Sequence, residues 1–192
     1  MKYPVFFLLL LLCGCEKLTS TPPVQQFPHV AQGSYAAALS DDGRYSAVSS
    51  IQDGVALWDL QTNALKYQWK HQDNAENLVF SLAISHNNSH VFTADQNTYA
   101  LWQLSNGENV GFWQLDAATV RDVAVSDNGE HLLIGKSNGG VQHITLASGR
   151  RLEFLGHTER INSVAMSPNG RYALTGGNDY KAHLWDTQSA QI

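Results

Sequence analysis

The stretch INSVAMS at residues 161–167 decides the fold, because close copies of it occur three times earlier in the chain. The copies are VRDVAVS at residues 120–126, VFSLAIS at 79–85 and, more loosely, SYAAALS at 34–40. Their final serines, at positions 40, 85, 126 and 167, lie 45, 41 and 41 residues apart. A unit of this length cannot bury its apolar face without a neighbour, so the period indicates one structural unit repeated along the chain.

Each copy continues with the same series of short segments. The serine is followed by a turn, such as PNG at residues 168–170, whose Pro, Asn and Gly suit a type I turn. Three more short runs follow, rich in β-branched and aromatic residues and separated by Gly, Asn and Asp. Such runs are typical of strands and show no helical period. Four strands per repeat at this spacing predict an all-β fold, a β-propeller of four-stranded blades.

Two Trp-Asp dipeptides, at residues 58–59 and 185–186, close the third run of their repeats, and Gly-His stands at 156–157. With these motifs in four aligned copies, the region of about residues 29–192 resembles the WD40 repeat family. The resemblance implies WD40-like blades, with repeats at about residues 29–71, 72–115, 116–156 and 157–192.

The family resemblance also assigns a buried, hydrogen-bonded set to the fourth repeat, made of His157, Thr175, Asp179 and Trp185. A buried indole N–H needs a partner, so we expect this set to lock the blade rather than to act as a catalytic hydroxyl–imidazole–carboxylate triad. The third repeat has Ile144 where the family has Trp. We expect a complete set in the fourth repeat alone.

The first 14 residues predict a lipoprotein signal peptide. Lys2 precedes an apolar run at residues 5–12 that is too short to span a bilayer as a helix. The following LCGC at residues 12–15 resembles the bacterial lipobox, in which cleavage precedes the last cysteine and that thiol is lipidated. The resemblance implies a membrane anchor at Cys15. The next residue, Glu16, implies sorting to the outer membrane, with the protein facing the periplasm.

Residues 15–28 comprise the lipidated cysteine and a polar, Pro-containing tether. The end of this tether, at residues 24–29, aligns with residues 151–157, where a fourth strand leads into the next blade. The last repeat stops after its third strand, at residues 191–192. Either the segment at 24–28 closes a four-bladed ring, or the chain is part of a longer product with more blades. Because WD40 rings usually have about seven blades, the resemblance favours a larger ring.

Composition and spacing argue against several functional classes. A formal net charge of −5 without a basic stripe argues against nucleic-acid binding. The eight histidines lack metal-site spacing, so we expect no metal. GKSNG at residues 135–139 matches the nucleophile motif of hydrolases, but it lies between two predicted strands where that motif needs a strand-to-helix turn. We therefore expect no enzyme and no cofactor.

The sequence favours a lipid-anchored protein-interaction platform in the bacterial cell envelope, with a protein partner that the sequence does not name. In the WD40 family the usual contact surface carries the loops from fourth to first strands. Glu159, Arg160 and Arg121 near these loops are the candidate partner-binding residues. One alternative is a propeller enzyme or small-ligand binder that uses the central channel. Another is an outer-membrane assembly factor, which rests on fold analogy alone.

Overall fold

The computed structural model describes residues 22–23, 33–73, 77–115 and 118–189, and every regular element in these ranges is a β-strand. The strands form four antiparallel sheets in chain order. The first sheet contains β1 (Ala37–Leu39), β2 (Tyr45–Ser50), β3 (Gly54–Asp59) and β4 (Ala64–Trp69). The second contains β5 (Ser81–Ile84), β6 (His90–Ala94), β7 (Thr98–Gln103) and β8 (Asn109–Gln114).

The third sheet contains β9 (Val120–Val125), β10 (His131–Lys136), β11 (Val141–Thr145) and β12 (Arg150–Phe154). The fourth holds three strands within the described residues, β13 (Ile161–Met166), β14 (Tyr172–Gly177) and β15 (Ala182–Asp186). In every sheet, strands consecutive in sequence are neighbours in space. This arrangement confirms the predicted all-β fold of propeller blades, and we number the sheets as blades one to four.

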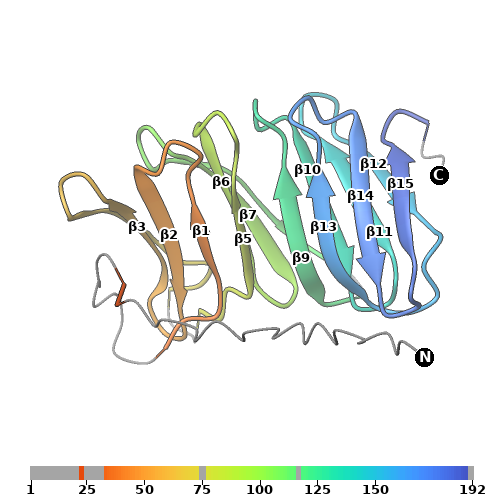
Figure 1. Cartoon of the computed structure of the whole chain (residues 1–192), viewed down its shortest axis with the longest axis horizontal. Helices are drawn as coiled ribbons and strands as arrows, with labels where there is room; N and C mark the ends of the chain where they lie inside the picture. The colour runs from red at the N-terminus through yellow and green to blue at the C-terminus, as the bar shows by residue number, and fades with distance from the viewer. Residues whose placement is uncertain (1–21, 24–32, 74–76, 116–117, 190–192) are drawn as a thin grey trace, which may run out of the picture.

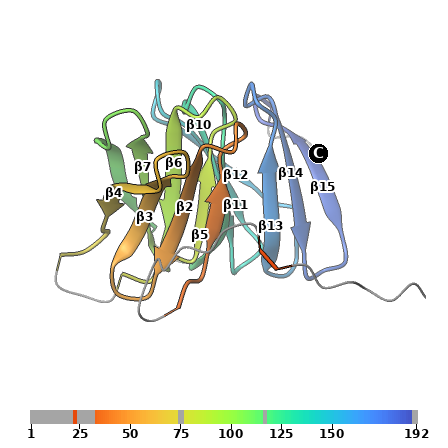
Figure 2. The same cartoon turned by 60° about the vertical axis from the view of Figure 1, so that its left-hand side comes forward.

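The blades stand side by side in chain order, with β1–β4 at one end of the row and β13–β15 at the other (Figure 1). Figure 2 shows the same row turned, with the sheet of β13–β15 again at one edge. The first strands of consecutive blades pack together, β1 on β5, β5 on β9 and β9 on β13. The segment at 24–28, predicted to be a closing strand, lies outside the described residues. The fourth strand of blade four therefore stays a prediction.

A serine after each first strand organises the turn that follows. In blade four the Ser167 hydroxyl donates to Asn169 Oδ1 at 2.8 Å and accepts from the N–H of Tyr172 at 2.9 Å. Gly170 adopts a φ of 70°, which residues with a Cβ rarely tolerate. These local bonds fix the point at which the second strand begins, which explains why a Ser-x-Asn or Ser-x-Asp turn recurs in each repeat, with Gly at its fourth position in blades one, three and four.

The Asp of each Trp-Asp dipeptide also holds a turn. Asp59 accepts from Nε and Nη2 of Arg44 at 3.1 and 3.0 Å, and Asp186 accepts from the same atoms of Arg171 at 3.0 and 2.8 Å. Both carboxylates accept backbone N–H groups of the turn after the third strand as well. Exposed ion pairs add little stability, so these contacts mainly set the path of the chain.

Within the described residues, apolar side chains form three hydrophobic clusters, one between each pair of consecutive blades. Because residues alternate between the faces of a strand, each blade has a front face toward the next blade and a back face toward the preceding one. Trp69 of blade one stacks on Trp102 of blade two with ring centroids 5.3 Å apart. Phe154 of blade three stacks on Trp185 of blade four at 5.0 Å. Burial of a large apolar side chain contributes about 1.5–3 kcal/mol, so these interfaces hold the row together.

Candidate functional site

The four residues assigned to blade four by family resemblance lie in one chain of hydrogen bonds. Trp185 on β15 donates through Nε1 to Oγ1 of Thr175 on β14 at 2.9 Å. The same Oγ1 lies 2.9 Å from Nε2 of His157, and Nδ1 of His157 lies 2.9 Å from Oδ1 of Asp179. His157 precedes β13 and Asp179 lies in the turn between β14 and β15. The set therefore ties two loops to the middle of the blade.

The carboxylate of Asp179 fixes the direction of these bonds. An ionised carboxylate only accepts, so Nδ1 of His157 carries a proton and donates it to Asp179. Burial alone would raise the pKa of Asp179. Hydrogen bonds from His157 and from the N–H groups of Thr158 and Lys181 outweigh burial and lower the pKa to about 2. The set is therefore organised around a negative charge.

The order hydroxyl, imidazole, carboxylate is that of a catalytic triad, but the surroundings argue for a structural role. Thr175 and Trp185 are each 1% exposed, so a substrate has no path to the hydroxyl. The Thr175 oxygen also accepts the indole N–H of Trp185, which occupies a lone pair that a nucleophile needs. A fully hydrogen-bonded buried network instead rigidifies the strands that carry it.

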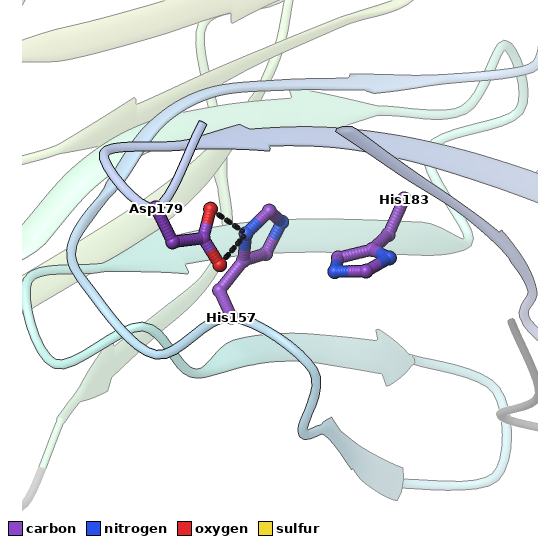
Figure 3. Close-up of side chains that lie close together, drawn as sticks. All are labelled: His157, Asp179 and His183. Carbon is purple, nitrogen blue, oxygen red and sulfur yellow. Dashed lines mark hydrogen bonds and ion pairs between the residues drawn. The ribbon is translucent and has the colours of Figure 1, made fainter. Parts of the chain in front are cut away.

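His183 on β15 lies beside this set and completes a group of three side chains that resembles a metal site (Figure 3). The ligand atoms of His157, Asp179 and His183 lie within 4.8 Å of one another. Both ring nitrogens of His157 are already engaged, by Asp179 and by Thr175. A metal bound at about 2.0–2.2 Å would have to break one of these bonds. The geometry therefore favours the hydrogen-bonded network over a metal centre.

Blade two contains a second set of the same kind. Trp102 donates through Nε1 to Oγ1 of Thr93 at 2.8 Å, and Nε2 of His71 lies 2.8 Å from that oxygen. Nδ1 of His71 lies 2.8 Å from Oγ1 of Thr98 and 3.6 Å from Oδ2 of Asp95. Blade two therefore has a related set that the sequence analysis missed, in which Thr98 rather than the aspartate forms the hydrogen bond to the imidazole. Among the described residues, the complete set with a directly bonded aspartate is the one in blade four, as predicted.

Different spacing concealed the second set from sequence analysis. His71 stands 22 residues before Thr93, whereas His157 stands 18 residues before Thr175. Lys70 precedes His71 where the fourth repeat has Gly. One feature of the sequence still pointed to the set in blade two. Thr93 precedes Trp102 by nine residues, and Thr175 precedes Trp185 by a similar ten residues.

The carboxylate in blade two is held in the same electrostatic state as its counterpart in blade four. Burial would raise the pKa of Asp95, but the nearby imidazole of His71, the side chain and N–H of Thr98 and the N–H of Asn97 lower it to about 2. Blades two and four are thus each built around an ionised aspartate.

A further polar residue, Asp122 on β9, links three blades. The repeat pattern of the sequence did not predict this role. Its Oδ1 accepts from the Ser81 hydroxyl of blade two at 2.9 Å. Its Oδ2 accepts from the N–H of Val164 in blade four at 2.8 Å. One half-buried side chain therefore connects the first strands of blades two, three and four.

The predicted partner-binding residues lie on the face formed by the loops before each first strand and between the second and third strands. We call this the loop face. Arg121 lines a cavity of about 250 Å³ together with Phe80, Gln96, Thr119 and Val120. Glu159 and Arg160 are exposed in the loop before β13, where the Arg160 carbonyl accepts from the N–H of Asn178 at 2.9 Å. The three predicted residues thus lie at the first strands of adjacent blades.

The predicted anchor cannot be placed in this site, since Cys15 lies outside the described residues. Within the residues that the structure describes, no helix has the length and apolar character needed to cross a membrane.

Comparisons with known proteins agree with the blade architecture. Residues 149–186 match the family model described as WD domain, G-beta repeat. The WD repeat-containing protein SL1-17 of Schistosoma mansoni is 25% identical over 87% of this chain and 55% of its own length. An uncharacterized WD repeat-containing protein of Synechocystis is 33% identical over 53% of this chain and 29% of its own length. Protein groucho of Drosophila melanogaster is 22% identical over 87% of this chain and 23% of its own length.

The chain therefore spans about half or less of the length of these relatives. The four sheets are consistent with propeller blades of the WD40 type, one of which matches the family model, and these relatives are WD-repeat proteins or share a similar stretch.

Proposed function

We propose that this protein is a lipid-anchored interaction platform of the bacterial cell envelope and that it contacts its protein partner through the loop face. The observation that carries the proposal is the cavity of about 250 Å³ that Arg121 lines together with Phe80 and Gln96. Arginine and aromatic side chains in a concave site are enriched among the residues that dominate binding energy at protein interfaces.

The charges on this face favour a partner segment with acidic or hydrogen-bond-accepting side chains. Arg121 is exposed and forms no ion pair with the residues that the structure describes. Arg160 lies on the adjacent blade and presents a second exposed guanidinium. A guanidinium offers five N–H donors in a planar fork, which binds a carboxylate through two parallel bonds.

The two hydrogen-bonded sets suit this role because they hold the loop face in place. His71 and His157 lie in the loops that precede first strands, and Asp95 and Asp179 lie in the loops between second and third strands. In each set, the loop before a first strand and the loop between the second and third strands are both connected to a buried threonine, Thr93 or Thr175. A partner then meets a surface that is already ordered, which lowers the entropy cost of binding.

Crosslinking and affinity capture from membranes test the platform, with the full chain as bait. Reversal of two charges on the loop face, Arg121→Glu with Arg160→Glu, should abolish capture of the partner that the unmodified chain retains. Arg151→Glu serves as the matched control, because Arg151 is also an exposed arginine and lies on the outer strand β12. Equal capture by all three chains would show that the loop face is not the contact surface.

The anchor is tested separately, through Cys15→Ser. Each buried methylene of a lipid chain contributes about 0.8 kcal/mol to membrane binding, so loss of the acyl chains should move the protein to the soluble fraction or leave an unprocessed precursor. Density-gradient fractionation assigns the unmodified protein to the inner or outer membrane. A Cys15→Ser chain that is still acylated would disprove the lipobox assignment while leaving the interaction platform untouched.

A further inference from the structure

The turn between β14 and β15 holds a tyrosine in a backbone conformation that tyrosine rarely adopts. Tyr180 has a φ of 64°, in the left-handed region. Every other left-handed residue that the structure describes is a glycine or an asparagine, the residue types that tolerate this region best. A bulky residue in this region is strained, and strained residues persist where their surroundings hold them and gather at functional sites.

Hydrogen bonds on both sides of Tyr180 hold this conformation. Asp179, the residue before it, accepts from the N–H of Lys181, the residue after it, at 3.2 Å. The N–H of Asn178 donates to the carbonyl of Arg160 at 2.9 Å. The turn is therefore tied both to itself and to the loop before β13, which contains Arg160.

Blade three contains the same turn with a glycine in place of the tyrosine. There the side chain of Asn138 accepts from the N–H two residues further on, at 3.1 Å, as Asp179 does in blade four. Gly139 follows Asn138 and has a φ of 86°. The two turns thus share one backbone path, and Gly139 is the equivalent of Tyr180.

The glycine of blade three serves the contact between blades. A Cβ on Gly139 would lie 2.8 Å from the carbonyl oxygen of Glu159 and 2.9 Å from that of His157, in the loop before β13. This loop packs on the turn because no side chain stands there. Tyr180 has a side chain at the equivalent place, so it excludes any neighbouring loop packed in the same way. Within the described structure its side chain is fully exposed.

The surroundings of Tyr180 define what would bind there. Its ring offers a large, rigid apolar surface with a polar hydroxyl, and tyrosine is enriched among the residues that dominate binding at protein interfaces. Leu155, in the loop before β13, is 78% exposed and adds a second apolar side chain to the loop face of this blade. The exposed charges on the two loops are Arg160 and Lys181, which are positive, and Glu159, which is negative. Neither cation forms an ion pair with the described residues.

We propose that Tyr180 is the aromatic anchor through which the loop face binds a segment of its protein partner. An apolar side chain of that segment covers the ring, and a neighbouring acidic side chain pairs with Arg160 or Lys181. This role rests on the proposed function, and it names the point of the loop face that the partner occupies. The tied turn presents the ring in one position before binding, which lowers the entropy cost of the contact.

Photocrosslinking in cell envelopes tests the contact, with benzoyl-phenylalanine in place of Tyr180, of Arg121 or of Tyr172 in the full chain. Tyr172 is the matched control, because it is a second exposed tyrosine of blade four and starts β14, at the other end of that strand from the turn. The probe at Tyr180 should join a partner protein, and mass spectrometry should place the adduct in a segment with an apolar and an acidic residue side by side. The probe at Tyr172 should give no adduct with that partner.

The other outcomes of the crosslinking are distinct. An adduct from Arg121 without one from Tyr180 would overturn the anchor and leave the interaction platform standing, whereas no adduct from either position would remove both. A crosslink from Tyr180 to another part of the same polypeptide would overturn the proposal, as would an adduct in a segment without an acidic residue.

A synthetic peptide copy of the crosslinked segment then separates recognition from stability. Tyr180→Gly should weaken binding of this peptide by about tenfold or more, as expected for a dominant interface residue. It should not lower the melting temperature, because glycine relieves the left-handed strain. Tyr180→Phe is the control that keeps the ring, and it should retain most of the affinity. A lower melting temperature with unchanged affinity in Tyr180→Gly would show that the tyrosine serves the fold and not a partner.

Discussion

His143 allows a sharp test of the packing between blades, because a histidine stands there at an apolar position of the repeat. The equivalent residues of the other blades are Leu57, Leu101 and Leu184. His143 is 2% exposed, and its Nδ1 has no hydrogen-bond partner among the described residues. Its Nε2 faces Nδ1 of His131 at 3.2 Å. Burial, together with the charges of His131 and Arg150, lowers the pKa of His143 to about 4.

The direction of the pH effect follows from this shift. A histidine in the unfolded chain takes up its proton near the ordinary value of 6.5, whereas the folded chain resists protonation of His143 down to about pH 4. Between these values the unfolded state binds more protons, so the free energy of unfolding falls as the pH is lowered through this window. Each pKa unit corresponds to about 1.4 kcal/mol, and screening by nearby solvent reduces the effect, so we expect a loss of about 1–3 kcal/mol from this group.

The variant His143→Leu should remove this loss and add stability at neutral pH. An unsatisfied buried polar atom costs about 1–3 kcal/mol, and leucine removes the unpaired Nδ1 of His143. Nδ1 of the half-buried His131 loses His143 as a partner and keeps the Thr145 hydroxyl at 3.5 Å. Urea unfolding followed by tryptophan fluorescence at pH 7, 6, 5 and 4 measures both effects. The stability gained over the unmodified chain should grow as the pH falls.

His143→Asn separates the two contributions, because asparagine is polar but does not titrate. It should flatten the pH dependence as leucine does, without the gain at pH 7. A difference between His143→Leu and the unmodified chain that stays constant from pH 7 to pH 4 would refute the reasoning, because it would show that the imidazole does not resist protonation in the folded state.

Three further predictions concern the hydrogen-bonded networks. Trp185→Phe should lower the free energy of unfolding by about 1–3 kcal/mol, because Thr175 loses its donor. Ile144→Val should lower it by about 0.5–1.5 kcal/mol, through the loss of one methylene. Equal shifts of the urea midpoint for the two variants would argue against the network. Asp179 has a pKa of about 2 when folded, so its share of the stability is complete above about pH 4 and is lost as the pH falls toward 2. Asp179→Asn should weaken this acid-induced loss in a melting series, and an unchanged acid profile would contradict the assignment. Asp122→Ala should lower the free energy of unfolding by about 1–3 kcal/mol and weaken the contact of blade four with blades two and three. The measurement is amide hydrogen exchange at Val164, which should become faster; unchanged exchange would contradict the proposed link.

The strands were predictable from the sequence because their signals are local. The Ser-x-Asn-Gly turn at residues 167–170 works through bonds between residues two to five positions apart, such as Ser167 to Asn169 and Tyr172 to Ser167. A serine followed two residues later by Asn or Asp marks the start of each second strand in the same way. Local chemistry of this kind is visible in a single chain without knowledge of what packs against it.

The candidate site was predictable only where its spacing matched the family pattern. The set of blade two depends on His71, whose distance along the chain to Thr93 is set by the length of a loop rather than by strand geometry. The role of Asp122 could not be predicted, for another reason. Its partners Ser81 and Val164 lie 41 and 42 residues away on different blades, and nothing in one repeat shows how its neighbours are placed.

One repeat position shows how the blades come to differ in role. Leu57 and Leu101 are buried apolar contacts, and His143 brings a titratable group into the same place. At Leu184 the position returns to leucine but lies on the surface, on the front face of blade four. The repeats specify a common backbone, which makes these side chains equivalent in geometry. Any difference in their behaviour must then come from the side chain itself or from what covers it, and substitutions at this single position probe both causes.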